Sequence, residues 1–236
     1  MQDRQVVTCF LVHRGRIALL RRSERVATFR GAWAGVSGTV DRGRTPGAQA
    51  LAEIREETGR DDARLLVTGP PMAIDAPGYQ TRFLVHPFLF HLPSESLRLD
   101  WEHTEARFVR RDEIPGLPTV PGLLEVFDAV GSAGSLAGAV QALCDGIRDD
   151  RIRGAEDRAA DALDALALCR LADAFHGAGA SDWRRVAGRL SATRPGMEAV
   201  RTARARGALD AAAAVDAGDA AEAIFATRAG GHRRSL

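Results

Sequence analysis

The chain has 236 residues, 45% of them hydrophobic, and a formal net charge of +1. A chain of this length can bury a core in each of two domains. The near-zero net charge supplies no global basic field, so we expect no nucleic-acid partner. No signal peptide and no apolar run long enough to span a bilayer is recognisable, so we expect no membrane partner either.

Residue usage narrows the chemistry further. The three cysteines, Cys9, Cys144 and Cys169, are odd in number and lack the spacing of a metal site. Free thiols of this kind are typical of a reducing compartment, so we expect a cytoplasmic protein. All 32 residues counted as Lys or Arg are arginine, which excludes chemistry that needs a catalytic lysine.

The first elements in chain order are predicted strands. Residues 6–12 form an apolar, β-rich run, and residues 16–20 form a second one after a tight turn at 13–15. A third extended segment, residues 33–40, leads into Gly38 and the loop that follows it.

A helix is predicted to begin at Pro46 and to end before Gly59. Thr45 is a good N-cap residue, and proline suits the first helical position because its missing N–H needs no partner there. Gly59 lies where a left-handed C-terminal residue usually ends a helix. The predicted helix is about three turns long.

Three carboxylates share one side of this helix. Glu53, Glu56 and Glu57 stand at positions i, i+3 and i+4, so their side chains project together. One interpretation is a solvated charged face. The other is a metal site, since crowded like charges are costly unless a cation neutralises them, and oxygen ligands favour Mg²⁺ or Mn²⁺.

Beyond the helix the chain returns to predicted strands, at residues 63–68 and 81–92, the second long and alternating. Between them, residues 72–80 are predicted to form a loop that covers the pocket. Residues 99–109 lead into a last strand and contain Glu102 and Glu105.

The composition changes near residue 130. Residues 130–135 are small and glycine-rich, which indicates a linker. The rest is dominated by Ala, Arg, Asp, Leu and Gly, with apolar residues at helical spacing. We therefore predict a first domain at 1–129, a linker at 130–135, a helical domain at 136–228 and a flexible tail at 229–236.

The stretch 38–60 resembles the Nudix box, and the resemblance extends over about residues 4–127. The box pattern is matched without gaps at Gly38, Glu53, Ile54, Glu56, Glu57 and Gly59. Three positions depart from it. Arg44 replaces the first glutamate of the box, Ala52 replaces its arginine, and Arg60 replaces an aliphatic residue. Arg60 is spaced to pair with Glu56 or Glu57 instead.

The resemblance implies the fold and the reaction of a Nudix hydrolase. The expected fold class is α+β, with a Nudix α/β/α sandwich built on a mixed sheet, followed by an all-α domain. The expected substrate is a nucleoside diphosphate linked to another group, such as a sugar or ADP-ribose. The family's metal ligands correspond to Glu53, Glu56 and Glu57, with help from the backbone near Gly38, which is also an expected substrate contact. Because Arg44 replaces an acid near the cation, it is expected to point away or towards substrate phosphate.

Two further acids are expected to take part. Glu102 or Glu105, in a segment that resembles the family's Glu-His sequence, is the expected additional ligand or general base. The competing interpretation is a surface turn that merely carries acidic residues.

The second half resembles the helical N-terminal part of the translation initiation factor 2B and ribose-1,5-bisphosphate isomerase superfamily, over about residues 136–226. Arg153, Gly154 and Ala155 match a turn that contacts sugar phosphate in the isomerases. The catalytic domain of those isomerases has no counterpart here, so no isomerase activity is expected. The helical half is expected to form a homodimer, to dock a partner protein or to sense a sugar phosphate.

Three hypotheses for function remain at this stage. The first is a Mg²⁺-dependent Nudix hydrolase. The second is a Nudix-like nucleotide-binding module that has lost turnover through its changes at Arg44 and Ala52. The third is a regulatory subunit that pairs with a protein similar to initiation factor 2B or to an isomerase.

Overall fold

The computed structural model describes residues 2–132 and the single residues 138, 145 and 165. The chain divides into two units, Met1–Ala139 and Val140–Leu236. Nearly all of the described residues belong to the first unit, and the predictions for the helical half lie outside them. In the described part, no helix is long and apolar enough to cross a membrane.

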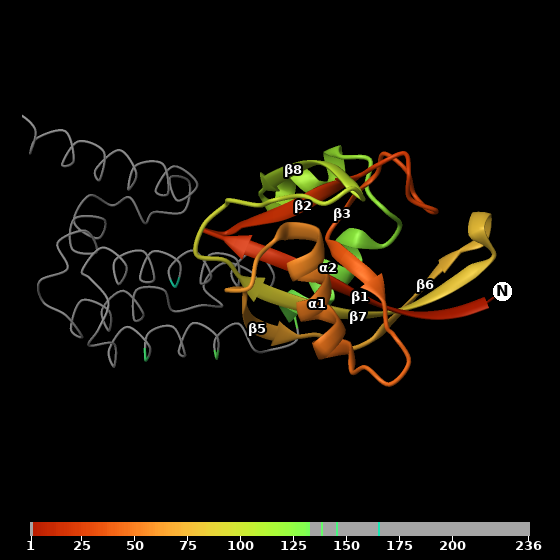
Figure 1. Ribbon diagram of the computed structural model, residues 1–236, viewed down its shortest axis with the longest axis horizontal. Helices are drawn as coiled ribbons and strands as arrows, with labels where there is room; N and C mark the ends of the chain where they lie inside the picture. The colour runs from red at the N-terminus through yellow and green to blue at the C-terminus, as the bar shows by residue number, and fades with distance from the viewer. Residues whose placement is uncertain (1, 133–137, 139–144, 146–164, 166–236) are drawn as a thin grey trace, which may run out of the picture. The chain divides into compact units, whose positions relative to one another are not determined.

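In the first unit, eight described strands form one mixed sheet (Figure 1). They are β1 (Gln2–His13), β2 (Arg16–Arg22), β3 (Trp33–Ala34), β4 (Val36–Thr39), β5 (Arg64–Thr68), β6 (Met72–Ala76), β7 (Thr81–His91) and β8 (His103–Val109). The main order is β3-β2-β1-β7-β5, with β4 paired to β1, β6 to β7 and β8 to β2.

The two longest strands lie side by side at the centre. β1 and β7 pair in parallel from Gln2↔Thr81 to Val12↔His91, whereas the other strand pairs are antiparallel. The predicted turn between the first two strands is confirmed. It uses left-handed backbone at Arg14 (φ 47°) and Gly15 (φ 74°), which lets the chain reverse within two residues.

Helix α1 (Pro46–Thr58) confirms the local predictions for the glutamate-bearing segment. The backbone N–H of Ala48 donates to Thr45 Oγ1 at 3.2 Å, so Thr45 is the N-cap. Gly59 closes the other end with a left-handed φ of 65° and donates its N–H to the carbonyl of Arg55. Proline at the start and glycine at the end therefore set the position of the helix along the chain.

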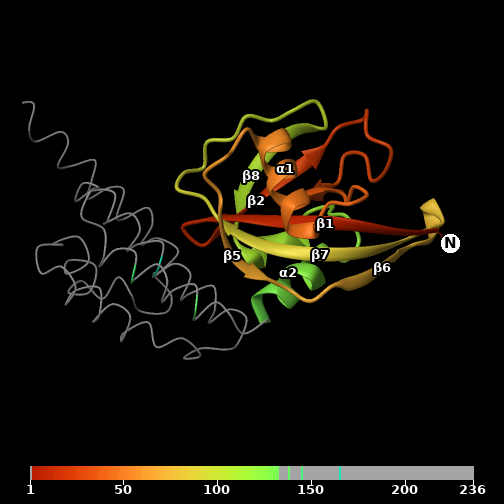
Figure 2. The same ribbon diagram turned by 60° about the horizontal axis from the view of Figure 1, so that its bottom comes forward.

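Helices cover both faces of the sheet (Figure 2). Ala50 and Ile54 of α1 pack on a core formed by β1, β2, β4 and β7, which includes Val7 and Phe90. Helix α2 (Leu123–Ser132) packs Phe127 against Phe10 of β1, with ring centroids 4.9 Å apart. Two short 3-10 helices, η1 (Pro77–Tyr79) and η2 (Arg111–Gly116), complete the described elements. The mixed sheet between helices confirms the expected architecture of the first unit.

Two segments differ from the sequence predictions. Residues 72–76 are not a loop but strand β6, paired with β7 from Met72↔Val85 to Ala76↔Thr81. A short strand of this kind depends on its partner, so the pattern of its own residues does not reveal it. Helix α2 extends into the segment 130–135, because Val130 is fully buried and continues its apolar face.

Candidate functional site

Gly38 allows a glutamate of α1 to lie against strand β4. A Cβ atom at Gly38 would be 1.7 Å from Glu53 Oε1 and 2.1 Å from Glu53 Cδ. Any side chain at this position would therefore displace the carboxylate. Gly38, the first glycine of the box, therefore lies against Glu53, although a loop and the start of the helix separate the two residues in sequence.

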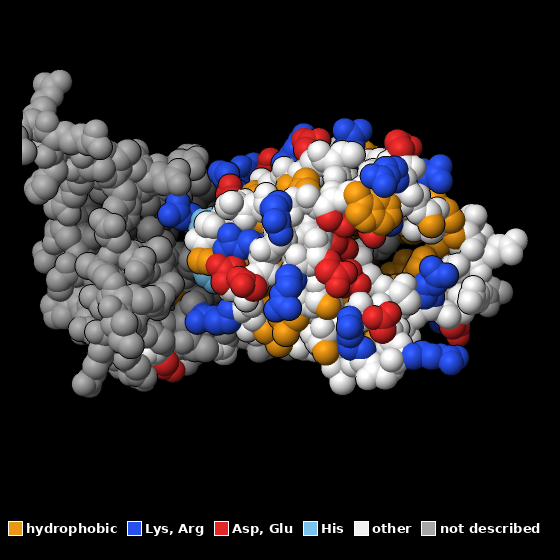
Figure 3. Space-filling view, in the orientation of Figure 1, with side chains coloured by type: hydrophobic (Ala, Val, Ile, Leu, Met, Phe, Trp, Pro, Cys, Tyr) orange, Lys and Arg blue, Asp and Glu red, His pale blue; other side chains and the backbone are white. Residues whose placement is uncertain are grey.

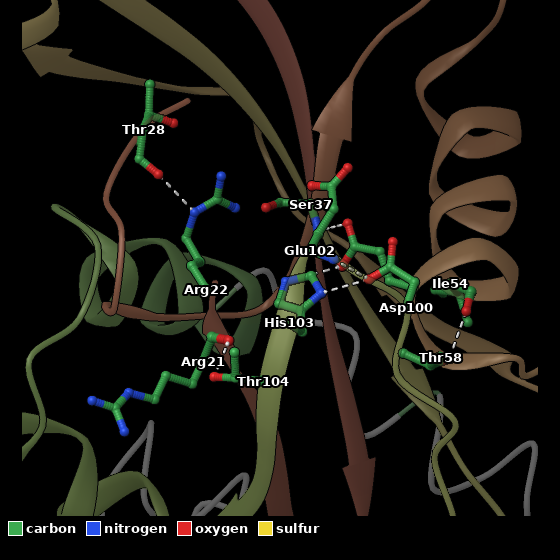
Figure 4. Close-up of polar contacts among 11 residues, drawn as sticks. Arg21, Arg22, Thr28, Ser37, Ile54, Thr58, Asp100, Glu102, His103 and Thr104 are labelled. Atoms are coloured by element: carbon green, nitrogen blue, oxygen red, sulfur yellow. Dashed lines mark hydrogen bonds and ion pairs between the residues drawn. The ribbon is translucent and has the colours of Figure 1, made fainter. Parts of the chain in front are cut away.

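Glu57 is held on the neighbouring side of the same helix. The backbone N–H of Ser37 donates to Glu57 Oε1 at 3.3 Å, and His103 Nε2 lies 3.7 Å from Glu57 Oε2. On the far side of the imidazole, Nδ1 is 3.3 Å from Asp100 Oδ1, which also accepts the N–H of Glu102 at 3.0 Å (Figure 4). The contacts from Asp100 to His103 and from His103 to Glu57 therefore link the segment before β8 to α1.

Burial shifts the pKa values of these groups towards their neutral forms. Burial raises the pKa of Glu57 well above the usual carboxyl value, and the charge of Glu53 raises it further. Burial also raises the pKa of Glu53, a shift that the hydrogen bond from Gln49 opposes and the charge of Glu56 reinforces. Burial lowers the pKa of His103, against the opposing effect of Asp100. Burial therefore favours the neutral form of the His103 imidazole and opposes ionisation of the Glu57 carboxyl.

The remaining predicted acids occupy different surroundings. Glu56 is exposed, and its charge contributes to the raised pKa values of Glu53 and Glu102. Glu102 is half-buried, and burial followed by the charge of Asp100 raises its pKa. Glu105 instead forms ion pairs with Arg107 at 2.8 Å and Arg21 at 3.8 Å. The structure thus places Glu102 near the glutamates of α1, whereas Glu105 pairs with two arginines.

Contacts account for two of the three departures from the box, at Arg44 and Arg60. Arg44 Nη1 donates to Gln49 Oε1 at 3.2 Å and pairs with Asp41 at 3.3 Å, so its charge is directed into the loop. Ala52 is partly buried in α1. The expected pairing of Arg60 with Glu56 or Glu57 is wrong, because its guanidinium binds Asp62 with two hydrogen bonds of 2.8 Å. Arg153, Gly154 and Ala155 lie outside the described residues.

The donor set was tested for its fit to a divalent cation. Within the described ranges, no three acidic, histidine or cysteine side chains already surround a single point. Glu57 Oε2 and His103 Nε2 are nevertheless buried and make no hydrogen bond to any described residue. Carboxylates that repel one another, with a buried oxygen left without a donor, suit a hard cation. The exposed Glu56, next to Glu57 in sequence, adds a third carboxylate, so the residues fit Mg²⁺ or Mn²⁺.

A cavity of about 530 Å³ opens beside these carboxylates. Figure 3 shows acidic side chains at the edge of a hollow whose interior is hydrophobic. Glu53 and Glu102 line it together with three arginines, Arg4, Arg22 and Arg25. Its apolar wall includes Phe29, Val26, Ile74, Phe83, Val85, Trp101, Val120 and Leu123. The cavity therefore offers an acidic edge, cationic groups and aromatic rings in one space.

The segment between β2 and β3 is fixed over this cavity. The guanidinium of Arg25 lies 4.9 Å from the centre of the Trp101 ring, and Arg22 Nε donates to the carbonyl of Thr28 at 3.0 Å. Phe29 has an unusual φ of 51° and donates its N–H to the hydroxyl of Tyr79 at 2.9 Å. A bulky residue held in left-handed backbone is strained, so this conformation depends on the contacts around it.

Three contributors to the site were missed by the sequence argument. Gln49, Ser37 and His103 contact the glutamates, but their types alone indicate no such role. A buried glutamine one turn before Glu53 was the one available signal, and it becomes meaningful only when the burial of α1 is known. The contacts of Ser37 and His103 depend on how the sheet brings distant segments together.

Comparison with known proteins supports one family. The model of the NUDIX domain matches residues 2–129, just over half of the chain. No curated protein matches. Among solved structures, the MutT protein from Methanosarcina mazei Go1 is 22% identical, with 54% of this chain and 91% of that one covered and a TM-score of 0.46.

Two further solved structures are similar to the same part of the chain. The MutT NUDIX hydrolase from Burkholderia pseudomallei is 23% identical, with coverage of 55% and 99% and a TM-score of 0.47. The dihydroneopterin triphosphate pyrophosphohydrolase of E. coli is 18% identical, with coverage of 54% and 96% and a TM-score of 0.46. Because the family model matches residues 2–129, more than half of the chain, the chain belongs to the NUDIX domain family.

Proposed function

We propose that this protein is a Mg²⁺- or Mn²⁺-dependent hydrolase that cleaves the phosphoanhydride of a nucleoside diphosphate linked to another group. The observation that carries the proposal is the position of Glu53 and Glu102 at the edge of a cavity that also contains arginines and aromatic rings. Carboxylates suit the metal, guanidinium groups suit phosphate, and rings suit a base or sugar.

The substrate would lie across the cavity with its phosphates towards the glutamates. Arg22 and Arg25 line the cavity and bind the non-bridging phosphate oxygens. Phe29, Phe83 or Trp101 offers a face for a base or a second ring. Nucleotide sugars and ADP-ribose both fit this arrangement.

Different side chains of the protein bind the metal and accept the proton during hydrolysis. Glu53, Glu56 and Glu57 would hold the cation, with Glu57 oriented by the Ser37 N–H. When bound, the cation would neutralise charge at the phosphoryl oxygens and lower the pKa of the attacking water. Glu102 accepts a proton from the attacking water, a role that its raised pKa favours. Water adds to one phosphorus as the bridging P–O bond breaks, which gives two phosphate monoesters.

The proposal is tested with purified full-length protein, Mg²⁺ and a panel of ADP-ribose, dinucleoside polyphosphates, nucleotide sugars and nucleoside triphosphates. Chromatography of the products should reveal metal-dependent cleavage of at least one class. Glu57→Gln should reduce kcat/KM by about tenfold to a hundredfold or more. Glu105→Gln is the matched control, because Glu105 pairs with Arg107 and Arg21, and it should retain activity.

A second candidate is a Nudix-like binding module without turnover. It is favoured by Arg44, a cation in place of an acid, and by the lack of three ready-arranged metal donors within the described ranges. Saturable binding of a panel member, with no product at any Mg²⁺ or Mn²⁺ concentration, would select this candidate over hydrolysis.

For residues 136–228 we propose an assembly role, as a dimerisation module or as the docking site of a partner similar to initiation factor 2B or to an isomerase. The basis is the sequence resemblance of that segment and its match at Arg153, Gly154 and Ala155. Sedimentation of the full-length chain tests self-association. Co-purification from the native source, compared with a preparation lacking residues 136–236, tests for a partner.

A further inference from the structure

Gln49 lies in the first half of α1 with only 5% of its surface exposed. A buried side-chain amide is costly unless its donor and its acceptor are both paired. Both ends of Gln49 are paired. Its Nε2 donates to Glu53 Oε1 at 2.7 Å, and its Oε1 accepts from Arg44 Nη1 at 3.2 Å and from the N–H of Asp41 at 3.3 Å.

The chemistry of these partners determines which way the amide faces. Arg44 and the Asp41 N–H can only donate, so they require the carbonyl oxygen of Gln49. The carboxylate of Glu53 requires the NH₂ group. A flipped amide would place an oxygen against a carboxylate and an NH₂ group against two donors, and would lose all three hydrogen bonds. These contacts therefore fix the orientation of the Gln49 amide. Its oxygen faces Asp41 and Arg44, and its NH₂ group faces Glu53.

Within the described part of the chain, Gln49 is the one side chain that donates a hydrogen bond to Glu53. Ala52, its neighbour in sequence, has no donor, and Arg60 is bound to Asp62. Gly38 also approaches the carboxylate closely, because a Cβ atom there would be 1.7 Å from Glu53 Oε1. Between these two contacts, Glu53 is restricted to a narrow range of side-chain conformations.

We propose that Gln49 is a positioning residue of the metal site, which occupies Glu53 Oε1 and leaves Glu53 Oε2 available for the cation. Arg44 and the Asp41 N–H act through Gln49 by holding its carbonyl oxygen. The inference rests on the proposed metal-dependent function. It assigns to the unusual Arg44 a supporting role in that site, in which its guanidinium contacts Gln49 and the Gln49 amide contacts Glu53.

The test measures Mn²⁺ binding to the metal-free full-length protein without substrate, by electron paramagnetic resonance of the free ion. Gln49→Met keeps the length of the side chain and removes its donor and acceptor. Its Kd for Mn²⁺ should increase about tenfold or more, as for other residues that orient metal ligands. Gln5→Met is the matched control, because Gln5 is an exposed glutamine on β1 that contacts His86, and its Kd should not change.

Arg44→Met provides an independent test with a definite sign. If Arg44 acted only through its charge, its removal would relieve repulsion and tighten Mn²⁺ binding. Support of Gln49 predicts the opposite, a several-fold weaker affinity. Arg44 is 42% exposed, so this variant should fold even if Gln49→Met does not.

Activity measurements separate positioning from chemistry. Gln49→Met should require more Mg²⁺ for half-maximal rate and should regain most of its kcat at saturating Mg²⁺. Wild-type affinity for Mn²⁺ in Gln49→Met, or tighter binding in Arg44→Met, would overturn the inference while leaving the proposed function intact. Absence of Mn²⁺ binding by the wild-type protein would overturn both.

Discussion

At the scale of single residues, the part of the site that could be predicted is the part set by local spacing. Glu53, Glu56 and Glu57 share one side of a helix whatever the rest of the chain does. The contacts of Glu57 with Ser37 and His103 are different, since they join α1 to β4 and β8. No pattern within a helix contains this information, which becomes available only when the pairing of the strands is known.

Gly38 provides a prediction at this scale. Gly38→Ala would place a Cβ atom 1.7 Å from Glu53 Oε1, so the carboxylate must move. Because a displacement of about 1 Å in a catalytic group costs about a hundredfold in rate, kcat/KM should decrease by at least that order. Steady-state kinetics with the best substrate of the panel provides the measurement.

A glycine in the same region serves as the control. A Cβ atom at Gly47 would meet nothing within 4 Å, and Gly47 lies in the first turn of α1. Gly47→Ala should therefore leave activity unchanged and add slightly to the stability of the helix. Equal activities of Gly38→Ala and the wild-type protein would show that Glu53 does not need its present position.

At the scale of elements, helix α1 was predictable and strand β6 was not, for opposite reasons. The ends of α1 are encoded in adjacent residues, with Thr45 and Pro46 at one end and Gly59 at the other. β6 has no such local signals and owes its conformation to β7, which follows it after a single 3-10 turn. Local chemistry is readable from sequence, whereas pairing between segments is a property of the folded sheet.

The N-cap of α1 can be tested directly. Thr45→Ala removes the acceptor for the Ala48 N–H, so the free energy of unfolding should decrease by about 1 kcal/mol. Thr45→Ser retains the hydroxyl and should stay close to the wild-type value. Urea unfolding of the three proteins provides the comparison, and equal losses for Ala and Ser would argue that the methyl group, not the cap, contributes the stability.

At the scale of the whole molecule, ionised carboxylates at the candidate site lower the free energy of unfolding, and the rest of the fold must offset this loss. Glu57 is 3% exposed, and burial together with the charge of Glu53 raises its pKa. In the unfolded chain this carboxyl ionises near 4.5, whereas in the folded, metal-free protein it retains its proton to a higher pH. Between these two pKa values, unfolding releases a proton.

This difference fixes the direction of a pH dependence. Because the folded state binds more protons at Glu57 than the unfolded state in that window, the contribution of Glu57 to the stability of the metal-free protein should fall as the pH rises above about 4.5. The slope from a single group cannot exceed about 1.4 kcal/mol per pH unit. Below the unfolded pKa both states are protonated, so Glu57 imposes no penalty there.

Comparison of the wild-type protein with Glu57→Gln isolates this contribution, since most other titrating groups are shared. Urea unfolding in the presence of EDTA should give the wild-type protein the steeper loss of stability between pH 5 and the folded pKa of Glu57. Saturating Mg²⁺ should raise the stability of the wild-type protein, because a cation that binds only the folded state adds RT ln(1 + [Mg²⁺]/Kd) and favours the ionised carboxylate. Parallel pH profiles for the two proteins would mean that Glu57 ionises as readily in the folded chain as in water. Ionised Glu57 would then not destabilise the folded protein, and a cation would have no such destabilisation to relieve.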